Sequence, residues 1–486
     1  MASNDTMMQF FEWYLPSDST LWTKVTKEAR KFANLGINYM WLPPAYKGSG
    51  GVYDVGYGVY DLYDLGEFDQ KGTVPTKYGT KDEYLEAIRE LKNNNIKVIA
   101  DIVLNHKLGG DETEEVIAVQ DDAENRNISI SEAKMIKAWT KYTFPGRGDK
   151  YSDFKWDWTH FHGVDWDETT STASIYKFYG KKWDKDVDDE YGNFDYLMGA
   201  DIDLNNIDVI NELKNWGLWY YSFTNVDGFR LDAVKHIRAD FFPGWLGAIR
   251  ASADKNLFAV GEYWSLNIEK LRKYIEKSEG VMSLFDVPLH FNFFNASRSN
   301  GEFDMSKIFE GTLVNEFPDK AVTFVDNHDT EMGQGLESWI LDWFKPIAYS
   351  LILLREKGMP CVFYGDYYGI PEKEVIPKNV YLDKLLKVRK YFAYGEQEDY
   401  FYDRNKIGFV RRGDYDHPDS GVAVVMTDKL GGIVRMNIGK KFANTMFYDC
   451  LGMVDSKVYI DDEGYGDFSC LDGSVSVWIK DGQYVN

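Results

Sequence analysis

The chain has few cysteines, no long apolar run and no recognisable leader. Only Cys361, Cys450 and Cys470 occur among 486 residues, an odd number without the spacing of a zinc site. Buried free thiols are the favoured interpretation, although a Cys450–Cys470 bridge stays open. No apolar run reaches the length of a membrane-spanning helix, and the N-terminal segment MASNDTMMQFFEWY lacks the parts of a signal peptide. Unless a leader has been removed, these absences predict a cytoplasmic protein.

Basic residues are also scarce relative to acidic ones. The chain has 55 Lys and Arg against 78 Asp and Glu, a net charge of −23. Such a surface repels phosphate backbones and anionic lipids, which disfavours nucleic-acid and membrane partners. Aromatic residues, in contrast, are plentiful, with 15 Trp and 33 Tyr. We expect some of them to line a groove, because the apolar faces of sugar rings stack on aromatic side chains.

Short apolar segments alternate with helical patterns along most of the chain. Helical periodicity is evident at 80–95 and at 336–358. Alternation over about 390 residues predicts an α/β protein with a (β/α)8 TIM barrel. The eight candidate strands are 7–14, 37–42, 97–104, 226–232, 257–263, 283–289, 322–327 and 360–365.

The alternation is interrupted once, between the third and fourth strands. About a hundred residues lie there, too many for a loop, and their richness in Asp, Trp, Tyr and Gly favours an inserted domain. After Gly395, short β-type runs alternate with Gly and Asp turns, which predicts a C-terminal antiparallel β-sandwich. The expected domains are therefore the barrel at 1–104 and 207–394, the inserted domain at 105–206 and the sandwich at 395–486.

Polar residues gather where four of the candidate strands end. The four motifs are DIVLNHK (101–107), GFRLDAVKH (228–236), GEYW (261–264) and FVDNHDT (324–330). Barrel enzymes carry their active-site residues at this end of the strands. Cleavage of a glycosidic bond requires two carboxyls with cationic or hydrogen-bonding neighbours. The motifs supply three acids and such neighbours, namely Asp232, Glu262, Asp329, Arg230, His106 and His328.

The local patterns suit acid–base and nucleophilic roles. Arg230 and Asp232 are two residues apart, so on a strand they project to the same face, where the cation keeps Asp232 ionised. Glu262 follows the apolar LFAVG and precedes Tyr263 and Trp264, so partial desolvation is expected to raise its pKa. The alternative is that Arg230 and Asp232 form only a structural ion pair. The three other motifs in register favour the catalytic interpretation.

The four motifs resemble the conserved regions of the α-amylase family of glycoside hydrolases. The resemblance covers nearly the whole chain and is strongest to the bacterial liquefying type, in particular its cytoplasmic branch. The further segments that carry it are FEWY (11–14), LPPAYKG (42–48), VGYGVYDLYDLGEFDQKGTVPTKYG (55–79), GNFDYLMGADID (192–203) and GSVSVWI (473–479).

This resemblance implies a monomeric enzyme that hydrolyses internal α-1,4-glucosidic bonds of starch, glycogen or maltodextrins with retention. It makes Asp232 the nucleophile, Glu262 the acid and base, and Asp329 the transition-state stabiliser. The alternatives are a related maltooligosaccharide-forming hydrolase, a glucan transferase, or a non-catalytic glucan-binding protein. The implied substrate-binding residues are Trp13, Tyr57, His106, Arg230, Lys235, His236, Trp264 and His328.

The resemblance also implies one structural calcium ion between the barrel and the inserted domain. Ca²⁺ prefers oxygen ligands. The chain departs from secreted relatives at His162 and Asn205, where they carry acids, and YDRNK (402–406) lacks the His-Asp pair of their C-terminal site. Additional calcium or sodium sites are therefore not expected. The implied ligands are Asn105, Asp195, Asp201 and the carbonyl of His236, with Asp184 and Asp203 as weaker candidates that could instead be surface acids.

Overall fold

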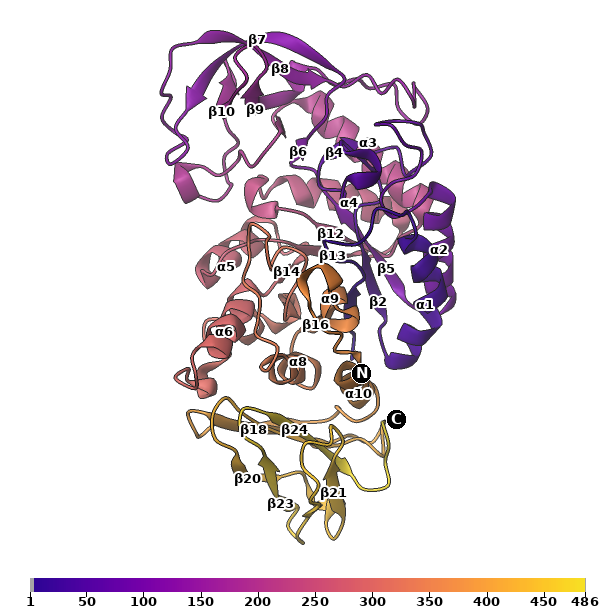
Figure 1. Ribbon diagram of the computed structural model, residues 1–486, viewed down its shortest axis with the longest axis vertical. Coiled ribbons are helices and arrows are strands. Elements are labelled where there is room, and N and C mark those ends of the chain that lie inside the picture. The colour runs from indigo at the N-terminus through magenta and orange to yellow at the C-terminus, as the bar shows by residue number, and fades with distance from the viewer. Residues whose placement is uncertain (1–3, 486) are drawn as a thin grey trace.

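Eight parallel strands close into a barrel at the centre of the molecule (Figure 1). The structure is a computed structural model that describes residues 4–485. The strands are hydrogen-bonded in the order β1-β16-β15-β14-β13-β12-β5-β2, and β1 also pairs with β2. The predicted barrel is thereby confirmed. Its strands are β1 (Met7–Gln9), β2 (Tyr39–Leu42), β5 (Lys97–Ile102), β12 (Gly228–Leu231), β13 (Phe258–Gly261), β14 (Ser283–Phe285), β15 (Ala321–Phe324) and β16 (Met359–Phe363).

Helices surround the barrel, and most of them bury one face while α8 (Lys345–Leu353) is buried on nearly all sides. Because both faces of a parallel sheet are covered, its strands are buried almost throughout, as in β2, β12 and β15. The helices longer than eight residues are α1 (Leu21–Leu35), α2 (Lys81–Asn93), α3 (Ile207–Thr224), α4 (Phe241–Ala253), α5 (Ile268–Lys277), α6 (Val287–Arg298), α8 (Lys345–Leu353) and α10 (Asn379–Tyr391).

Local chemistry sets the helix boundaries. The predicted helix at 80–95 forms α2, which starts after a capping box in which the Thr80 side chain accepts from the Glu83 backbone N–H. The predicted helix at 336–358 was too long, because only α8 forms there. Proline is tolerated in the first turn of a helix but not in its interior. Pro346 stands in the first turn of α8, so the helix starts beside it and the preceding residues form turns and coil.

An inserted domain follows β5 and lies at one end of the barrel, at the top of Figure 1. It contains a six-stranded sheet in the order β6-β11-β9-β10-β7-β8. The chain returns to the barrel through α3. The inserted domain thus covers the end of the barrel at which strands such as β5 terminate. Its strands are β6 (His106–Lys107), β7 (Glu112–Asp121), β8 (Lys134–Lys141), β9 (Phe161–Asp167), β10 (Thr172–Phe178) and β11 (Ala200–Ile202).

The C-terminal part forms the predicted antiparallel sandwich at the other end of the barrel (Figure 1). A six-stranded sheet, β17-β18-β19-β24-β21-β22, faces a two-stranded sheet, β20-β23, and Val425, Met436, Phe468 and Trp478 belong to one buried core between them. The strands are β17 (Gln397–Tyr400), β18 (Lys406–Arg411), β19 (Val422–Thr427), β20 (Gly432–Asn437), β21 (Met446–Asp449), β22 (Val458–Tyr459), β23 (Tyr465–Cys470) and β24 (Val475–Lys480).

Cys361, Cys450 and Cys470 are free and buried, as favoured from the sequence. Burial raises the pKa of each thiol, to about 12 for Cys361 and about 11 for Cys470. The three thiols are therefore protonated at neutral pH and chemically quiet. Within residues 4–485, the structure contains no helix with the length and apolarity needed to cross a lipid bilayer.

Candidate active site at the C-terminal end of the barrel

One arginine joins three acids at the end of the barrel that the inserted domain covers. The Arg230 side chain is fully buried. Its Nη1 donates to Asp232 Oδ1 at 2.6 Å and to Asp101 Oδ1 at 2.9 Å, and its Nη2 donates to Glu262 Oε2 at 2.5 Å. Because a guanidinium is small, planar and permanently charged, it holds the carboxyls of Asp232 and Glu262 side by side.

The backbone brings these residues together from three neighbouring strands. β12 pairs with both β5 and β13, so that Asp232 and Glu262 follow adjacent strands. Directly after Asp232 the chain turns at Ala233, whose φ of 48° lies in the left-handed region. The Ala233 N–H donates to Glu262 Oε2 at 3.3 Å. A non-glycine residue in this conformation is strained, and such strain is concentrated at functional sites.

The buried surroundings shift the pKa values of Glu262, Asp329 and Arg230. Burial raises the pKa of Glu262 well above its usual value, and the nearby Asp232 and Asp329 carboxylates raise it further, whereas Arg230 opposes the shift. Burial likewise raises the pKa of Asp329, to about 7. Burial opposes the charge on Arg230, but the surrounding carboxylates raise its pKa. Glu262 is thus prepared to hold a proton next to a fixed cation, as a general acid must.

Sequence reasoning missed Asp101, which completes the arginine network. This residue is fully buried within β5, and its Oδ2 accepts from Tyr57 Oη at 2.8 Å and from Trp41 Nε1 at 3.0 Å. The signal was present, because an acid inside an otherwise apolar strand requires a partner. Asp101 therefore links Arg230 to Tyr57, one of the predicted substrate-binding residues.

Three rings stand parallel beside the acids. The ring centroids of Tyr57 and His328 are 5.0 Å apart with planes 8° from parallel, and Trp13 and Tyr57 are 6.0 Å apart at 1°. His328 Nδ1 lies 3.0 Å from Gln9 Nε2, so the amide donates and the ring proton is assigned to Nε2. That Nε2 is buried and makes no hydrogen bond among the described residues, although Asp329 Oδ2 lies 3.3 Å from it. It is a donor available to a ligand.

The other predicted substrate-binding residues occupy the same region. His106 directs Nε2 to the Tyr57 carbonyl at 2.9 Å. Lys235 Nζ donates to Glu190 Oε2 at 2.8 Å and to the Trp264 carbonyl at 3.2 Å, which links the barrel to the inserted domain. His236 Nδ1 lies 2.7 Å from the Phe194 carbonyl, so this ring contacts the inserted domain. The structure thus collects all eight residues around one end of the barrel.

We expect replacement of Asp329 by Asn to stabilise the protein above neutral pH. Burial raises the pKa of Asp329 in the folded state to about 7, above its value in the unfolded chain. Between these two pKa values the unfolded chain has already lost the proton, so the free energy of unfolding falls as pH rises. Asn does not ionise, so the variant avoids this loss of stability. The melting temperature of the variant relative to the unmodified chain should rise from pH 5 to pH 9, as calorimetry at both values can measure. A difference independent of pH would contradict the expected burial of this charge.

The predicted metal ligands are brought together between the barrel and the inserted domain. Asp195 and Asp201 are buried and lie within one cluster of potential ligand atoms. The Ile202 N–H donates to the Asn105 carbonyl at 3.1 Å, which brings Asn105 next to β11, and the His236 ring meets the residue before Asp195. The weaker candidates Asp184 and Asp203 are 2% and 5% exposed, so the alternative that they are surface acids is wrong.

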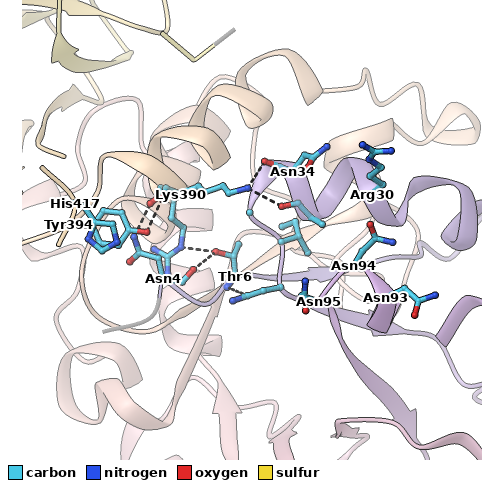
Figure 2. A pocket seen from close by; sticks show the side chains of 15 residues that line it. Asn4, Thr6, Arg30, Asn34, Asn93, Asn94, Asn95, Lys390, Tyr394 and His417 are labelled. Atoms are coloured by element: carbon cyan, nitrogen blue, oxygen red, sulfur yellow. Dashed lines mark hydrogen bonds between the residues drawn. The ribbon is translucent and has the colours of Figure 1, made fainter. Parts of the chain in front are cut away.

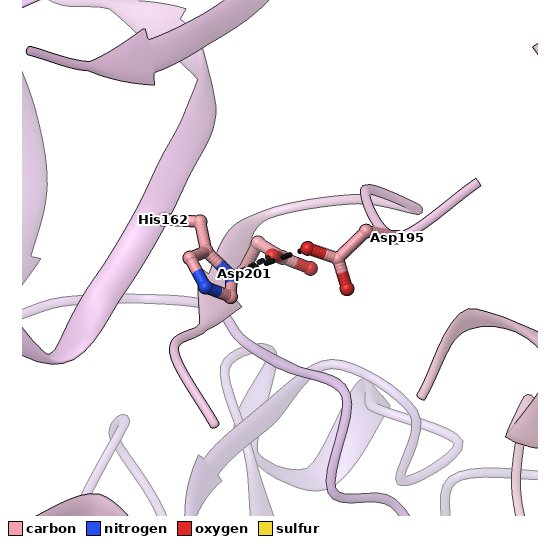
Figure 3. Close-up of side chains that lie close together, drawn as sticks. All are labelled: His162, Asp195 and Asp201. Atoms are coloured by element: carbon pink, nitrogen blue, oxygen red, sulfur yellow. Dashed lines mark hydrogen bonds and ion pairs between the residues drawn. The ribbon is translucent and has the colours of Figure 1, made fainter. Parts of the chain in front are cut away.

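The donor chemistry of this cluster fits a hard cation. Burial raises the pKa of Asp201 to about 6 and that of Asp195 well above its usual value; neighbouring carboxylates raise both pKa values further, whereas His162 opposes the shift. Clustered buried carboxylates require positive charge, and carboxylate, amide and carbonyl oxygens are the ligands of Ca²⁺. Sequence reasoning noted His162 only as a missing acid. The structure brings it into contact with the same aspartates (Figure 3).

A groove lies on the inserted domain near His106. Its volume is about 400 Å³, and Lys107, Trp139, Asp165 and Trp166 contribute to its lining. The two tryptophans are partly exposed, at 41% and 37%, and both indole N–H groups donate to Glu168 Oε2. This shared acceptor fixes the two rings in place. The expectation that surplus aromatic residues line a groove is met here.

One surface cavity does not belong to this site. It has a volume of about 680 Å³ and lies at the opposite end of the barrel (Figure 2). Thr6, Asn38 and Asn95 in its lining each precede a barrel strand. In barrel enzymes this end supports stability and the other end supports catalysis. The acids of the Arg230 network therefore mark the candidate active site.

Comparison with known proteins agrees with this architecture. The family description "Alpha amylase, catalytic domain" matches residues 25–399, and "Alpha-amylase C-terminal" matches residues 431–479. The chain is 55% identical to an α-amylase of Geobacillus stearothermophilus, over 98% of this chain and 87% of the relative. It is 49% identical to a glucan 1,4-α-maltohexaosidase of Bacillus sp. (strain 707), over 99% and 93%.

A third relative matches this chain over almost its full length. The cytoplasmic α-amylase of Escherichia coli (strain K12) is 45% identical, over 98% of this chain and 99% of that protein. The family match covers every barrel strand except β1 together with the inserted domain, and the matches to the three relatives extend over all three domains. With the acids and the arginine gathered at the end of the barrel, these matches lead to one conclusion: the chain belongs to the α-amylase family of glycoside hydrolases.

Proposed function

We propose that the chain cleaves internal α-1,4-glucosidic bonds of glycogen, maltodextrins or soluble starch, with Asp232, Glu262 and Asp329 as its catalytic acids. The observation that carries this proposal is the bridge from Arg230 to both Asp232 and Glu262. Carboxyls held by one guanidinium suit the separation of about 5–5.5 Å in retaining glycosidases better than the roughly 6.5–9.5 Å of inverting ones. The α-amylase family is of the retaining type.

In the first step Asp232 attacks the anomeric carbon while the bond from that carbon to the leaving glucan oxygen breaks. Glu262 delivers its proton to this oxygen. In the second step Glu262 takes a proton from water, the water oxygen bonds to the anomeric carbon, and Asp232 leaves. The raised pKa of Glu262 suits the acid role, and the permanent charge of Arg230 suits an ionised nucleophile.

The surrounding side chains would bind the distorted sugar ring. Asp329 Oδ2 and His328 Nε2 lie 3.3 Å apart and offer an acceptor and a donor side by side to ring hydroxyls. Hydrogen bonds that become stronger in the oxocarbenium-like transition state lower the activation barrier. Hydrogen bonds that are equally strong in the bound substrate and in the transition state do not. Tyr57 offers a flat face for stacking, and its hydroxyl is held by Asp101. Trp139 and Trp166 would contact glucose units further along the glucan.

Hydrolysis is favoured over the alternatives. The relatives at 45–55% identity are named α-amylases or a maltohexaosidase, which supports hydrolysis over glucan transfer. A purely binding role is disfavoured, because a binding protein has no use for a strained, buried arrangement of three acids and one arginine. We also propose a monomeric, cytoplasmic enzyme, in keeping with the relative from Escherichia coli that is named cytoplasmic.

One calcium ion is proposed for the boundary between barrel and inserted domain. Asn105, Asp195, Asp201 and the His236 carbonyl would hold it. When bound, Ca²⁺ supplies positive charge that fixes these segments next to each other. Because His236 is four residues after Asp232, order at this boundary is coupled to the position of the nucleophile. The ion is therefore structural and takes no part in bond cleavage.

The direct test is release of new reducing ends from glycogen and soluble maltodextrin, before and after exhaustive chelation. We expect cleavage of both glucans, loss of at least about nine-tenths of the rate on chelation, and recovery with added Ca²⁺. Cleavage that survives complete removal of metal would overturn the calcium proposal alone. Failure of the calcium-loaded, folded protein to cleave either glucan would overturn the proposed hydrolysis.

A further inference from the structure

Glu331 is a buried acid that the proposed mechanism does not use. It stands two residues after Asp329 and is 0% exposed, and its Oε1 accepts from the backbone N–H of Trp13 at 3.2 Å. This hydrogen bond joins segments that are 318 residues apart in the sequence. One segment follows β15 and carries His328 and Asp329, and the other follows β1 and carries Trp13. The bond therefore connects two sides of the candidate active site.

Tyr14 connects the same two segments. Its Oη donates to the Met332 carbonyl at 2.8 Å and accepts from Gln334 Nε2 at 2.8 Å. These bonds attach the turn after β1 to the loop after β15, but they do not reach Trp13. Among the residues that the structure describes, Glu331 is the only hydrogen-bond partner of Trp13. The position of the Trp13 backbone thus depends on this one carboxyl.

Trp13 contributes one of the three parallel rings in the site. Its ring plane lies 1° from that of Tyr57 and 8° from that of His328, with centroids 6.0 Å and 6.1 Å away. Trp13 is only partly buried, so packing alone does not fix its ring. A flat wall of rings suits the apolar face of a glucose unit. Displacement of one ring by about 1 Å would weaken productive binding of the sugar.

Two acids bind consecutive backbone N–H groups in this turn. Glu12 Oε2 accepts from the Tyr14 N–H at 2.5 Å, and Glu331 accepts from the preceding N–H, that of Trp13. Glu12 is 2% exposed. The second oxygen of Glu331, Oε2, is buried and has no hydrogen-bond partner among the described residues. Two buried carboxyls in such proximity do not both ionise, so one of them keeps a proton.

Glu331 is the acid that keeps the proton. Burial and three neighbouring acids raise the pKa of Glu331 to about 10, against the hydrogen bond from Trp13. Those acids are Glu12, Asp329 and Asp326. As a neutral acid, Glu331 still offers Oε1 as an acceptor to Trp13, and no unpaired charge is buried at Oε2.

The charges around Glu12 make it the more easily ionised of the two acids. Burial raises the pKa of Glu12 only to about 7, because the backbone N–H that it accepts from opposes the shift. The carboxylate of Glu372 adds to the shift, whereas Lys77 and Lys24 oppose it. Above neutral pH the pair therefore carries one negative charge, on Glu12, and one proton, on the other acid.

We propose that Glu331 is a positioning residue for glucan binding: as an uncharged acid it holds the backbone of Trp13, so that this ring stays parallel to Tyr57 beside the cleavage site. The inference rests on the proposed function, because the wall of rings matters to the reaction only if it binds a sugar. Glu331 takes no part in bond cleavage, and the acids around Arg230 keep their places without it.

The test compares initial rates of Glu331→Gln and Glu331→Leu on maltodextrin at neutral pH. Glutamine is uncharged and keeps an acceptor for the Trp13 N–H, so kcat and KM should stay within about twofold. Leucine has a similar size but no acceptor, so KM should rise about tenfold while kcat falls less than about threefold. Glu337→Leu is the matched control, because Glu337 accepts from the Gly333 N–H at 2.7 Å in the same loop without contacting Trp13. Its KM should not change.

Two further measurements separate positioning from a general loss of stability. In a Trp13→Ala background, Glu331→Leu should raise KM no further, because the ring that Glu331 positions is absent. The melting temperature of Glu331→Gln relative to the unmodified chain should rise from pH 5 to pH 9. In this range the unfolded chain loses the Glu331 proton and the folded chain keeps it, so the free energy of unfolding of the unmodified chain falls as pH rises.

The outcomes that would overturn the inference are distinct. An unchanged KM in Glu331→Leu would exclude the positioning role, and an equal loss in Glu331→Gln would show that the acid must be ionised. A fall in kcat at unchanged KM would connect Glu331 to the catalytic acids instead of to Trp13. If the Leu variant does not fold, Glu331→Ala takes its place. Cleavage by the unmodified chain is scored in the same assay, so failure of this inference leaves the proposed hydrolysis intact.

Discussion

Replacement of Asp232 by Asn abolishes turnover of maltodextrin and leaves the fold intact. We expect kcat/KM to fall on the order of 10⁴–10⁶-fold, because a neutral amide cannot form the covalent bond to the anomeric carbon. Asn has nearly the same shape, and Arg230 keeps Asp101 and Glu262 as partners, so the barrel retains most of its buried ion network. Initial rates and circular dichroism of the purified variant measure the two effects.

Two controls define the role of Asp232. The exposed Asp319 offers a matched substitution, and Asp319→Asn should retain full activity. An activated substrate provides the second control, because α-maltosyl fluoride requires a nucleophile even though its leaving group requires no acid. The Asp232→Asn variant should therefore be inactive on the fluoride as well. Retention of more than about one-tenth of the activity on either substrate would show that another group attacks the sugar.

Replacement of Glu262 by Gln separates acid catalysis from nucleophilic attack. We expect a loss of about 10²–10⁴-fold on maltodextrin, because the leaving glucan oxygen must be protonated. With α-maltosyl fluoride the first step needs no proton, so the variant should release a rapid burst of fluoride close to one equivalent of enzyme and then turn over slowly. Stopped-flow detection of fluoride measures this burst.

The pH profile provides an independent readout of the same role. Because burial raises the pKa of Glu262, the unmodified enzyme keeps the catalytic proton to well above pH 4.5 and loses activity as pH rises through that pKa. The residual activity of Glu262→Gln should lack this alkaline decline. The exposed Glu269→Gln serves as the matched control. If Glu262→Gln slowed the fluoride burst as much as it slowed maltodextrin cleavage, the acid role would belong to a different residue.

The barrel could be predicted because its strands carry two signals at once. An apolar run marks each strand, and a polar motif marks the end that opens into the site, as in β12 and β13. Boundaries were less accurate. The segment 283–289 was taken as one strand, but Asp286 accepts from the Leu289 N–H and thereby starts α6. A side chain that caps a helix competes with strand formation, and periodicity alone does not reveal it.

Site residues that belong to one sequence motif could be predicted. Site residues that only the folded chain places next to each other could not. Arg230 lies in β12 and Asp232 follows directly after this strand, two residues further on, so their proximity follows from spacing. The bond from Arg230 to Asp101 joins positions 129 residues apart and depends on the register of β5 and β12. The same holds for His162, whose position in the sequence reveals a missing acid and whose four acidic neighbours become evident only in the folded chain.

The central claim is that Asp232 and Glu262 act on α-glucans by two displacements. The most direct test is proton NMR of the reducing ends formed in the first seconds of maltodextrin cleavage, before the anomers equilibrate. Two inversions at the anomeric carbon predict that the new ends are α. Products that first appear as β-anomers would require a single displacement by water, and would contradict the assignment of Asp232 as the nucleophile.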